Sequence, residues 1–189
     1  NKNKLNTGFV GTPLLCNVLT EHGMTDLAYR LLLNEEYPGW LHEVKLGATT
    51  VWERWNSLDE NGRISSTGMN SLNHYSYGAV LEWIFRHVAG IDVTEQGPGG
   101  KMMRISPKVD YKLGSASAVY DSASGCYRCG WQIENGDQIT VTITVPFGAK
   151  AQVILPYAPD SVYHDTDNPL FETVENGICC VKAGQYTVT

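Results

Sequence analysis

The spacing of the hydrophobic residues changes at about Gly90, and this change constrains the fold more than any other feature of the chain. Before Gly90 the apolar residues recur at helical spacing. Thr12 is expected to cap the first helix, with Pro13 in its opening turn and a stop at His22. Further helices are predicted over residues 25–33, 49–55 and 71–89, separated by loops over residues 35–47 and 56–69.

Beyond Gly90 the apolar residues alternate with polar ones, as they do in strands. The clearest strand runs from Gln138 to Val145, with Ile and Val on one face and Thr on the other. Asn135-Gly136 before it is typical of a two-residue hairpin turn. Other short strands are expected over residues 103–105, 115–120, 127–133, 151–155, 177–181 and 186–188. The fold class is therefore α + β in two parts, with helices over residues 1–91 and an antiparallel β-sandwich over residues 92–189.

Size and charge narrow the function classes. A chain of 189 residues that is 42% hydrophobic can bury a core without covalent cross-links. A net charge of −6, with no runs of Lys or Arg, argues against nucleic acid and anionic membrane surfaces as partners. No apolar segment approaches the length needed to span a bilayer.

Cysteine usage bears on compartment and metal binding. The chain has five cysteines without a regular framework, which favours a reducing compartment and hence the cytoplasm, with the periplasm and secretion left open. Cys126 and Cys129 form a C-x-x-C, but the second pair of a zinc site is missing, so small apolar side chains on strands are the preferred interpretation. No metal or other cofactor is expected. The segment 165–168 is read as a polar turn rather than a calcium loop.

One carboxylate lies between two indoles and beside a guanidinium in the run Trp52-Glu53-Arg54-Trp55. Aromatic planes around a carboxylate are a common way to build a sugar subsite. Apolar walls disfavour the charged carboxylate and a cation favours it, so together they can poise Glu53 for proton transfer near neutral pH. On the pattern alone, a core aromatic cluster is the favoured interpretation, with Glu53 bonded to Arg54 or to backbone amides.

Five motifs in order carry a family resemblance: residues 7–13 (TGFVGTP), 30–33 (RLLL), 37–40 (YPGW), 48–55 (ATTVWERW) and 68–75 (GMNSLNHY). In combination they closely resemble the C-terminal portion of bacterial alpha-L-rhamnosidases, glycoside hydrolase family 78. The resemblance runs along nearly the whole chain and is strongest from Thr7 to Gly90.

The resemblance implies an (α/α)6 barrel with a pocket at one end, and hydrolysis of terminal alpha-L-rhamnosides with inversion. Inversion requires an acid and a base roughly 6.5–9.5 Å apart, with water between the base and the sugar. By the motif match Glu53 is the general base and His74 contacts the bound rhamnose. Asn70, Trp52 and Trp55 are implied neighbours in that pocket.

Two departures from the family pattern stand out. Asn56 occupies a position where family members often have Asp. The family's general acid lies upstream in the barrel, and none of Glu35, Glu36 and Glu43 matches it. The chain is therefore expected to comprise the last helices of a barrel and the C-terminal sandwich, to need the upstream part of the same polypeptide as a partner, and to have little activity alone.

Two other functions stay open at this point. The chain is also compatible with a non-catalytic carbohydrate-binding or scaffolding unit. The third option is an (α/α)6 glycosidase with a different sugar specificity. Binding of rhamnose without hydrolysis would favour the former, and product analysis on the whole enzyme would identify the latter.

Overall fold

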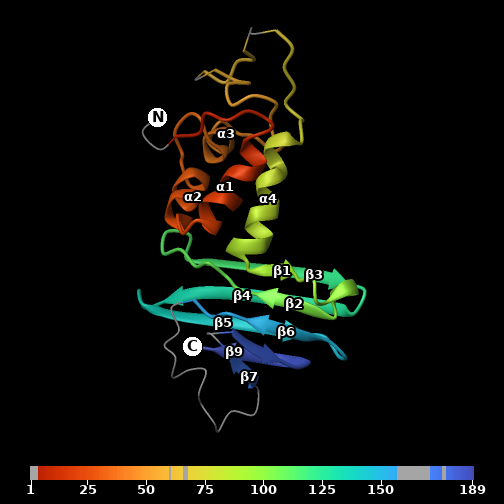
Figure 1. The fold of residues 1–189 in the computed structure, drawn as a ribbon. Coiled ribbons are helices and arrows are strands. Elements are labelled where there is room, and N and C mark those ends of the chain that lie inside the picture. Colours follow the sequence, from red (N-terminus) through yellow and green to blue (C-terminus); the bar gives the residue numbers. More distant parts are fainter. Residues whose placement is uncertain (1–3, 60, 66–67, 157–170, 176–177) are drawn as a thin grey trace. The chain divides into compact units, whose positions relative to one another are not determined.

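The computed structural model describes residues 4–59, 61–65, 68–156, 171–175 and 178–189. The chain forms two compact units, Asn1–Trp83 and Ile84–Thr189. The first is helical and the second consists of two sheets, which confirms the predicted α + β class with a β-sandwich (Figure 1). The segment 165–168 lies outside the described residues.

The helical unit contains α1 (Thr12–Glu21), α2 (Thr25–Leu32), α3 (Trp40–Lys45), the 3-10 turn η1 (Ser76–Ala79) and α4 (Val80–Trp83). α1 packs against α2 and against α4. Trp83, on α4, is fully buried. Its ring lies 5.2 Å from that of Tyr29 on α2 in an edge-on arrangement, and its indole N–H donates to the Thr20 hydroxyl on α1 over 2.8 Å. This contact satisfies the only polar atom that the large indole brings into the core.

The start of α1 differs from the prediction. Thr12 is the first helical residue rather than the cap, and Gly11 precedes the helix. The Thr12 side chain is buried, and its hydroxyl donates to the Gly8 carbonyl over 2.9 Å. The hydroxyl thus stabilises the turn before the helix instead of capping the helix N–H groups.

Three predictions around the Glu53 motif need larger corrections: the loop over residues 35–47 and the helices over residues 49–55 and 71–89. The predicted loop over residues 35–47 contains α3, because Trp40 and Glu43 bury their side chains there. Residues 49–55 are irregular and not helical, and the helix predicted from Ser71 begins at Ser76. From Ser76 the helical run continues through α4 into the π-helical turn η2 (Ile84–Val88).

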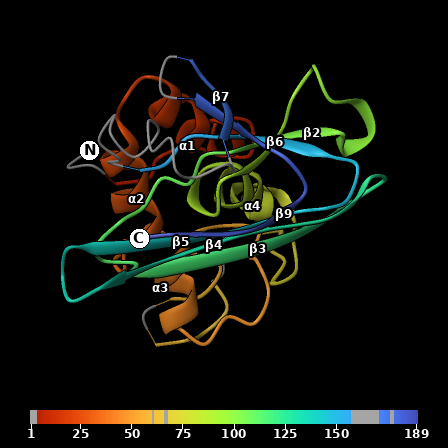
Figure 2. The ribbon, with the colours of Figure 1, turned by 90° about the horizontal axis from the view of Figure 1, so that it is seen from below.

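The sandwich unit has a five-stranded sheet in the order β1-β2-β6-β8-β7 and a four-stranded sheet in the order β3-β4-β5-β9. Figure 2 shows β3, β4 and β5 in one layer and β2 and β6 in the other. The strands and the short helical turn η3 among them have these bounds: β1 (Ile91–Val93), η3 (Pro98–Gly100), β2 (Met102–Ile105), β3 (Ser115–Ser122), β4 (Gly125–Glu134), β5 (Gln138–Val145), β6 (Lys150–Val153), β7 (Phe171–Glu175), β8 (Ile178–Val181) and β9 (Gly184–Val188).

Most strand pairs are antiparallel as predicted, but β2 and β6 run parallel, with Met103 opposite Ala151. β1 and β7 were not predicted from the sequence. The clean alternation of β5 is confirmed, since Val141, Ile143 and Val145 are all buried. The Tyr127 hydroxyl of β4 lies 2.7 Å from the Gly100 carbonyl oxygen and 3.0 Å from the Lys150 carbonyl oxygen, so its one proton is shared between them, and the contact with Lys150 links the two sheets. Among the described residues no helix is long and apolar enough to cross a bilayer.

Candidate functional site

Glu53 lies in an irregular segment that pairs with the segment carrying His74. The Glu53 N–H donates to the Ser71 carbonyl over 2.9 Å, and the His74 N–H donates to the Val51 carbonyl over 2.8 Å. The Thr50 hydroxyl adds a further bond to the Leu72 carbonyl. These bonds satisfy backbone groups that a helix would otherwise satisfy, which is why neither segment is helical. The predicted base Glu53 and the predicted sugar contact His74 therefore lie on two neighbouring segments of irregular backbone. Both side chains are half-buried.

Trp52 and Trp55 are buried, with 3% and 8% of their surface exposed. The Trp55 ring stacks on Tyr77 with 3.9 Å between centroids and 7° between planes, and Trp40 meets it edge-on at 5.4 Å. The indole N–H groups are satisfied by backbone: Trp55 donates to the Thr7 carbonyl and Trp40 to the Tyr77 carbonyl. The indoles therefore form a packed layer that supports the Glu53 segment, which agrees with the core-cluster alternative for the tryptophans.

His74 lies among aromatic rings. Its imidazole stacks on Phe9 with 4.8 Å between centroids and on Tyr75 with 5.7 Å. Phe9 is 43% exposed and Tyr75 is 87% exposed, so the group reaches the surface of the chain. The Ser76 N–H donates to His74 Nδ1 over 3.4 Å, which leaves the proton of the neutral ring on Nε2, the nitrogen that can donate to a ligand.

Asn70 stabilises the loop that follows Glu53. Its amide donates to the Ser57 carbonyl over 3.0 Å, and its carbonyl accepts from the Ser57 hydroxyl over 2.7 Å. Ser57 is fully buried, and its oxygen also accepts from the Arg54 N–H over 3.1 Å. The Asn70 side chain thus fixes the chain next to Glu53 through Ser57 and Arg54.

Glu43, which the sequence analysis considered only as a poor match to the general acid, is an unusual feature of this region. It lies on α3, is only 3% exposed, and its Oε1 has no hydrogen-bond partner among the described residues. Burial raises the pKa of Glu43 from 4.5 to about 7, and the backbone N–H of Trp52 opposes this shift by bonding to the carboxyl. The pKa of Tyr77 is also raised, first by burial and then by the charge of Glu43. The helical spacing from Trp40 to Val44 was the one available signal for α3.

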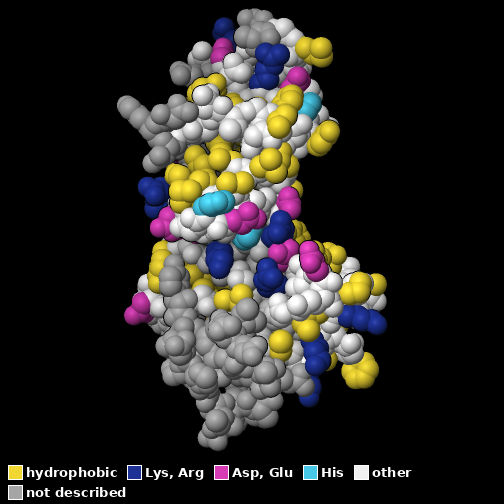
Figure 3. All heavy atoms as spheres, viewed as in Figure 1, with side chains coloured by type: hydrophobic (Ala, Val, Ile, Leu, Met, Phe, Trp, Pro, Cys, Tyr) yellow, Lys and Arg dark blue, Asp and Glu magenta, His cyan; other side chains and the backbone are white. Residues whose placement is uncertain are grey.

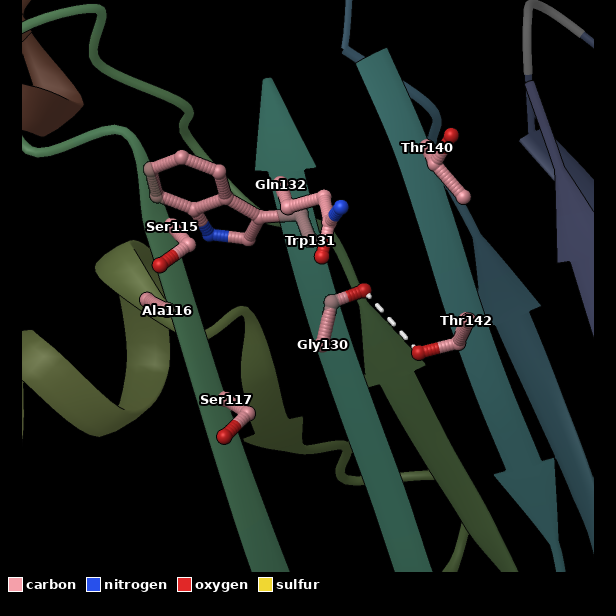
Figure 4. A pocket seen from close by; sticks show the side chains of 8 residues that line it. All are labelled: Ser115, Ala116, Ser117, Gly130, Trp131, Gln132, Thr140 and Thr142. Atoms are coloured by element: carbon pink, nitrogen blue, oxygen red, sulfur yellow. Dashed lines mark hydrogen bonds between the residues drawn. The ribbon is translucent and has the colours of Figure 1, made fainter. Parts of the chain in front are cut away.

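A separate groove of about 320 Å³ lies on the outer face of β3, β4 and β5 (Figure 4). Small and polar residues line it, and the Thr142 hydroxyl donates to the Gly130 carbonyl at its floor over 3.4 Å. It contains no titratable side chain, so it offers binding surface but no acid, base or nucleophile. Within the described part of the chain, no three His, Cys, Asp or Glu residues are grouped so as to hold a metal ion.

Two family models match the chain in order. The model described as the bacterial alpha-L-rhamnosidase 6 hairpin glycosidase domain matches residues 1–88. The model of the bacterial alpha-L-rhamnosidase C-terminal domain matches residues 90–168.

Similar proteins and solved structures agree with these matches. An alpha-L-rhamnosidase of Alteromonas sp. (strain LOR) is 41% identical over 96% of this chain, and one of Formosa agariphila is 40% identical over 92%. The chain spans only 19% and 18% of the length of these two relatives. The structure is similar to that of the Streptomyces avermitilis alpha-L-rhamnosidase complexed with L-rhamnose (TM-score 0.83, 36% identity, all of this chain and 18% of that one). It is also similar to the enzyme of Aspergillus terreus (TM-score 0.82, 30% identity, 98% of this chain and 19% of that one).

Proposed function

The chain belongs to the bacterial alpha-L-rhamnosidase family, and from this membership we propose that the whole protein removes terminal alpha-L-rhamnose from glycosides with inversion. The observation that supports this most directly is the pairing of residues 51–53 with residues 71–74. It brings the only Glu of the indole-flanked motif and the motif histidine together on one fixed piece of backbone.

Glu53 is the general base of the proposed reaction. Its carboxylate accepts a proton from a water molecule while the water oxygen bonds to the anomeric carbon of rhamnose. The bond from that carbon to the glycosidic oxygen breaks, and an acid on the other side of the sugar protonates the leaving oxygen. The pairing with Ser71 limits the movement of the Glu53 backbone, which favours a fixed distance between base and water.

The remaining residues of the proposed subsite hold the sugar and support the base. His74 Nε2 donates to a rhamnose hydroxyl, and Phe9 and Tyr75 beside it offer apolar surface for the sugar ring and its methyl group. Trp52 and Trp55 are buried, and as neighbours of Glu53 they support the subsite from the core. Asn70 keeps the adjoining loop in place.

The general acid is proposed to come from other helices of an (α/α)6 barrel, outside this chain. Figure 3 shows hydrophobic side chains at the surface of the helical unit, which such helices would cover. The exposed hydrophobic side chains of this unit include Leu14 (61%), Val18 (47%) and Leu81 (60%). Leu14 and Val18 lie one helical turn apart on α1, so they share a face. The isolated chain is therefore expected to show no turnover.

Substitution of the base tests the proposal. In the full-length enzyme, Glu53→Gln keeps the size of the side chain but cannot accept the proton of water, so kcat on an aryl rhamnoside should fall by about a hundredfold or more while KM changes little. Glu21→Gln, at an exposed carboxylate at the end of α1, is the matched control and should behave as the wild type. Wild-type kcat in Glu53→Gln would refute the assigned role.

Two further measurements test where the general acid lies and whether the configuration is inverted. The 189-residue chain is assayed on the same aryl rhamnoside, and turnover similar to that of the full-length enzyme would show that the acid lies within it. The anomer first released by the full-length enzyme is identified by NMR. Release of the sugar with retained configuration would exclude Glu53 as a base acting on water.

A further inference from the structure

Ser57 is a buried polar residue that none of the sequence motifs includes. It is 0% exposed, although it lies in the predicted loop over residues 56–69. A buried hydroxyl costs stability unless it is hydrogen-bonded, and Ala in the same place would avoid that requirement. The partners of the Ser57 hydroxyl therefore indicate what a polar side chain does at this position.

Ser57 holds both backbone polar groups of Arg54, the residue that follows Glu53. The Arg54 N–H donates to the Ser57 hydroxyl oxygen over 3.1 Å, and the Ser57 N–H donates to the Arg54 carbonyl over 3.0 Å. Residues 54–57 thus form a turn in which a side chain and a backbone group bond reciprocally. Because the Arg54 N–H belongs to the peptide group between Glu53 and Arg54, the turn fixes that peptide group.

Asn70 connects this turn to the segment that pairs with Glu53. The Ser57 hydroxyl donates to Asn70 Oδ1 over 2.7 Å, and Asn70 Nδ2 donates to the Ser57 carbonyl over 3.0 Å. The next residue, Ser71, accepts the Glu53 N–H with its carbonyl over 2.9 Å. Peptide bonds and hydrogen bonds together form a closed ring, made in order by Glu53, Arg54, Ser57, Asn70 and Ser71.

We propose that Ser57 is a positioning residue for the proposed rhamnosidase reaction, whose hydroxyl closes this ring and thereby sets the position of the Glu53 carboxylate. The inference rests on the proposed role of Glu53 as the base. The N–H groups of Glu53 and Arg54 lie on either side of the Glu53 α-carbon, and both have fixed acceptors. The direction in which the Glu53 side chain leaves the backbone is therefore fixed, and a base that must align a water with the sugar depends on this direction.

The test uses the full-length enzyme with Ser57→Ala and Ser57→Thr. Ala removes the hydroxyl bonds to Arg54 and Asn70, so kcat on an aryl rhamnoside should fall about tenfold with KM nearly unchanged, because a misplaced base slows chemistry more than binding. Thr keeps the hydroxyl, so Ser57→Thr should retain about a third or more of the wild-type kcat. Each variant is assayed well below its melting temperature, so that unfolded protein does not lower the apparent kcat.

Ser124→Ala is the matched control. The Ser124 hydroxyl also donates to a backbone carbonyl, that of Gly99 over 3.0 Å, but it lies in the sandwich unit. The control thus loses a comparable hydrogen bond outside the ring, and its kcat and KM should equal those of the wild type.

A double-mutant cycle tests the ring itself. Asn70→Ala opens the ring at a second point, so it should also lower kcat. Once the ring is open, the second substitution has little left to break, so kcat of Ser57→Ala with Asn70→Ala should be close to that of the weaker single variant. Losses that multiply instead would show two independent effects and would overturn the ring.

The outcomes distinguish the two proposals. Wild-type kcat in Ser57→Ala, together with loss of turnover in Glu53→Gln, overturns the positioning role alone. A rise in KM at unchanged kcat in Ser57→Ala also overturns it, because the hydroxyl would then act on sugar binding. If Ser57→Thr does not fold, the cycle with Asn70→Ala decides. Retained turnover in Glu53→Gln overturns the base assignment itself, whatever the Ser57 variants do.

Discussion

Glu43 makes the stability of the helical unit depend on pH in the neutral range. Its pKa is about 7 in the folded chain against 4.5 for the exposed group, so between these values the folded state binds more protons than the unfolded state. The contribution of Glu43 to the free energy of unfolding is therefore most favourable below about pH 4.5. It falls as the pH rises, by a total of about 3 kcal/mol once the pH is above about 7.

Glu43→Gln isolates this effect, since every other carboxylate is kept. We expect the variant to gain stability over the wild type, by up to about 3 kcal/mol, on going from about pH 4.5 to about pH 7.5. Urea unfolding of the 189-residue chain followed by tryptophan fluorescence measures it, and Glu35→Gln, on an exposed carboxylate before α3, serves as control. A constant difference between Glu43→Gln and wild type across that range would show that the buried carboxyl does not titrate there.

Residue by residue, the sequence singles out a candidate more readily where an unusual neighbour marks the position. Glu53 is marked by its two flanking indoles, and backbone hydrogen bonds pair its segment with the segment that carries His74. Glu43 has no such mark, because a Glu in a short helix is normally exposed. Its environment includes Trp52 and Tyr77, which come from other parts of the chain.

At the level of elements, local pattern failed where long-range pairing replaced local bonds. Residues 49–55 have helical spacing, but the Glu53 N–H and the Val51 carbonyl bond to the backbone of residues 71–74 instead of within a helix. β5, which is marked by clean alternation, was predicted with its observed bounds. β1 is only three residues long, and the parallel pair β2 and β6 joins strands far apart in sequence, which no local pattern can indicate.

Gly90 connects η2 to β1 and is predicted to tolerate no side chain. Its φ is +83°, and a Cβ there would lie 2.3 Å from the Pro107 nitrogen. Gly148 has a similar φ of +78° but open space around it, so it is the matched control. Gly148→Ala should cost about 1 kcal/mol from the backbone conformation, and Gly90→Ala about 3 kcal/mol more from the clash with backbone.

Urea unfolding of the two alanine variants measures this difference. Trp131 is the one tryptophan of the sandwich unit by sequence, and its indole donates to the Val88 carbonyl two residues before Gly90, so its fluorescence reports on this junction. Equal losses in Gly90→Ala and Gly148→Ala would show that Pro107 moves aside.

For the whole molecule, the change of periodicity at Gly90 was sufficient to predict two differently built parts. The structure divides into compact units between Trp83 and Ile84, inside the continuous helical run from Ser76 to Val88. Hydrophobic spacing marks where a helix changes to strands, but which part the last helical turn belongs to depends on packing. Val88 is buried with strand residues such as Ile91, so the turn joins the sandwich unit.

Substitutions on the exposed apolar face of α1 should affect the isolated chain and the full-length protein differently. Leu14→Ser with Val18→Ser should reduce self-association of the 189-residue chain in sedimentation velocity and leave its stability nearly unchanged, because both side chains are exposed there. In the full-length protein the proposed barrel helices cover this face, so the same pair should lower the free energy of unfolding by about 3 kcal/mol or more.

Phe147→Ser is the control, since this side chain is 97% exposed at the turn between β5 and β6. It should leave the stability of the full-length protein within about 0.5 kcal/mol of wild type, as surface substitutions usually do. If the α1 pair is equally harmless in the full-length protein, no further helices pack on that face and the barrel arrangement is refuted. If the pair is harmful there and only there, the face is an internal surface of the larger fold, and the general acid is to be sought on the helices that cover it.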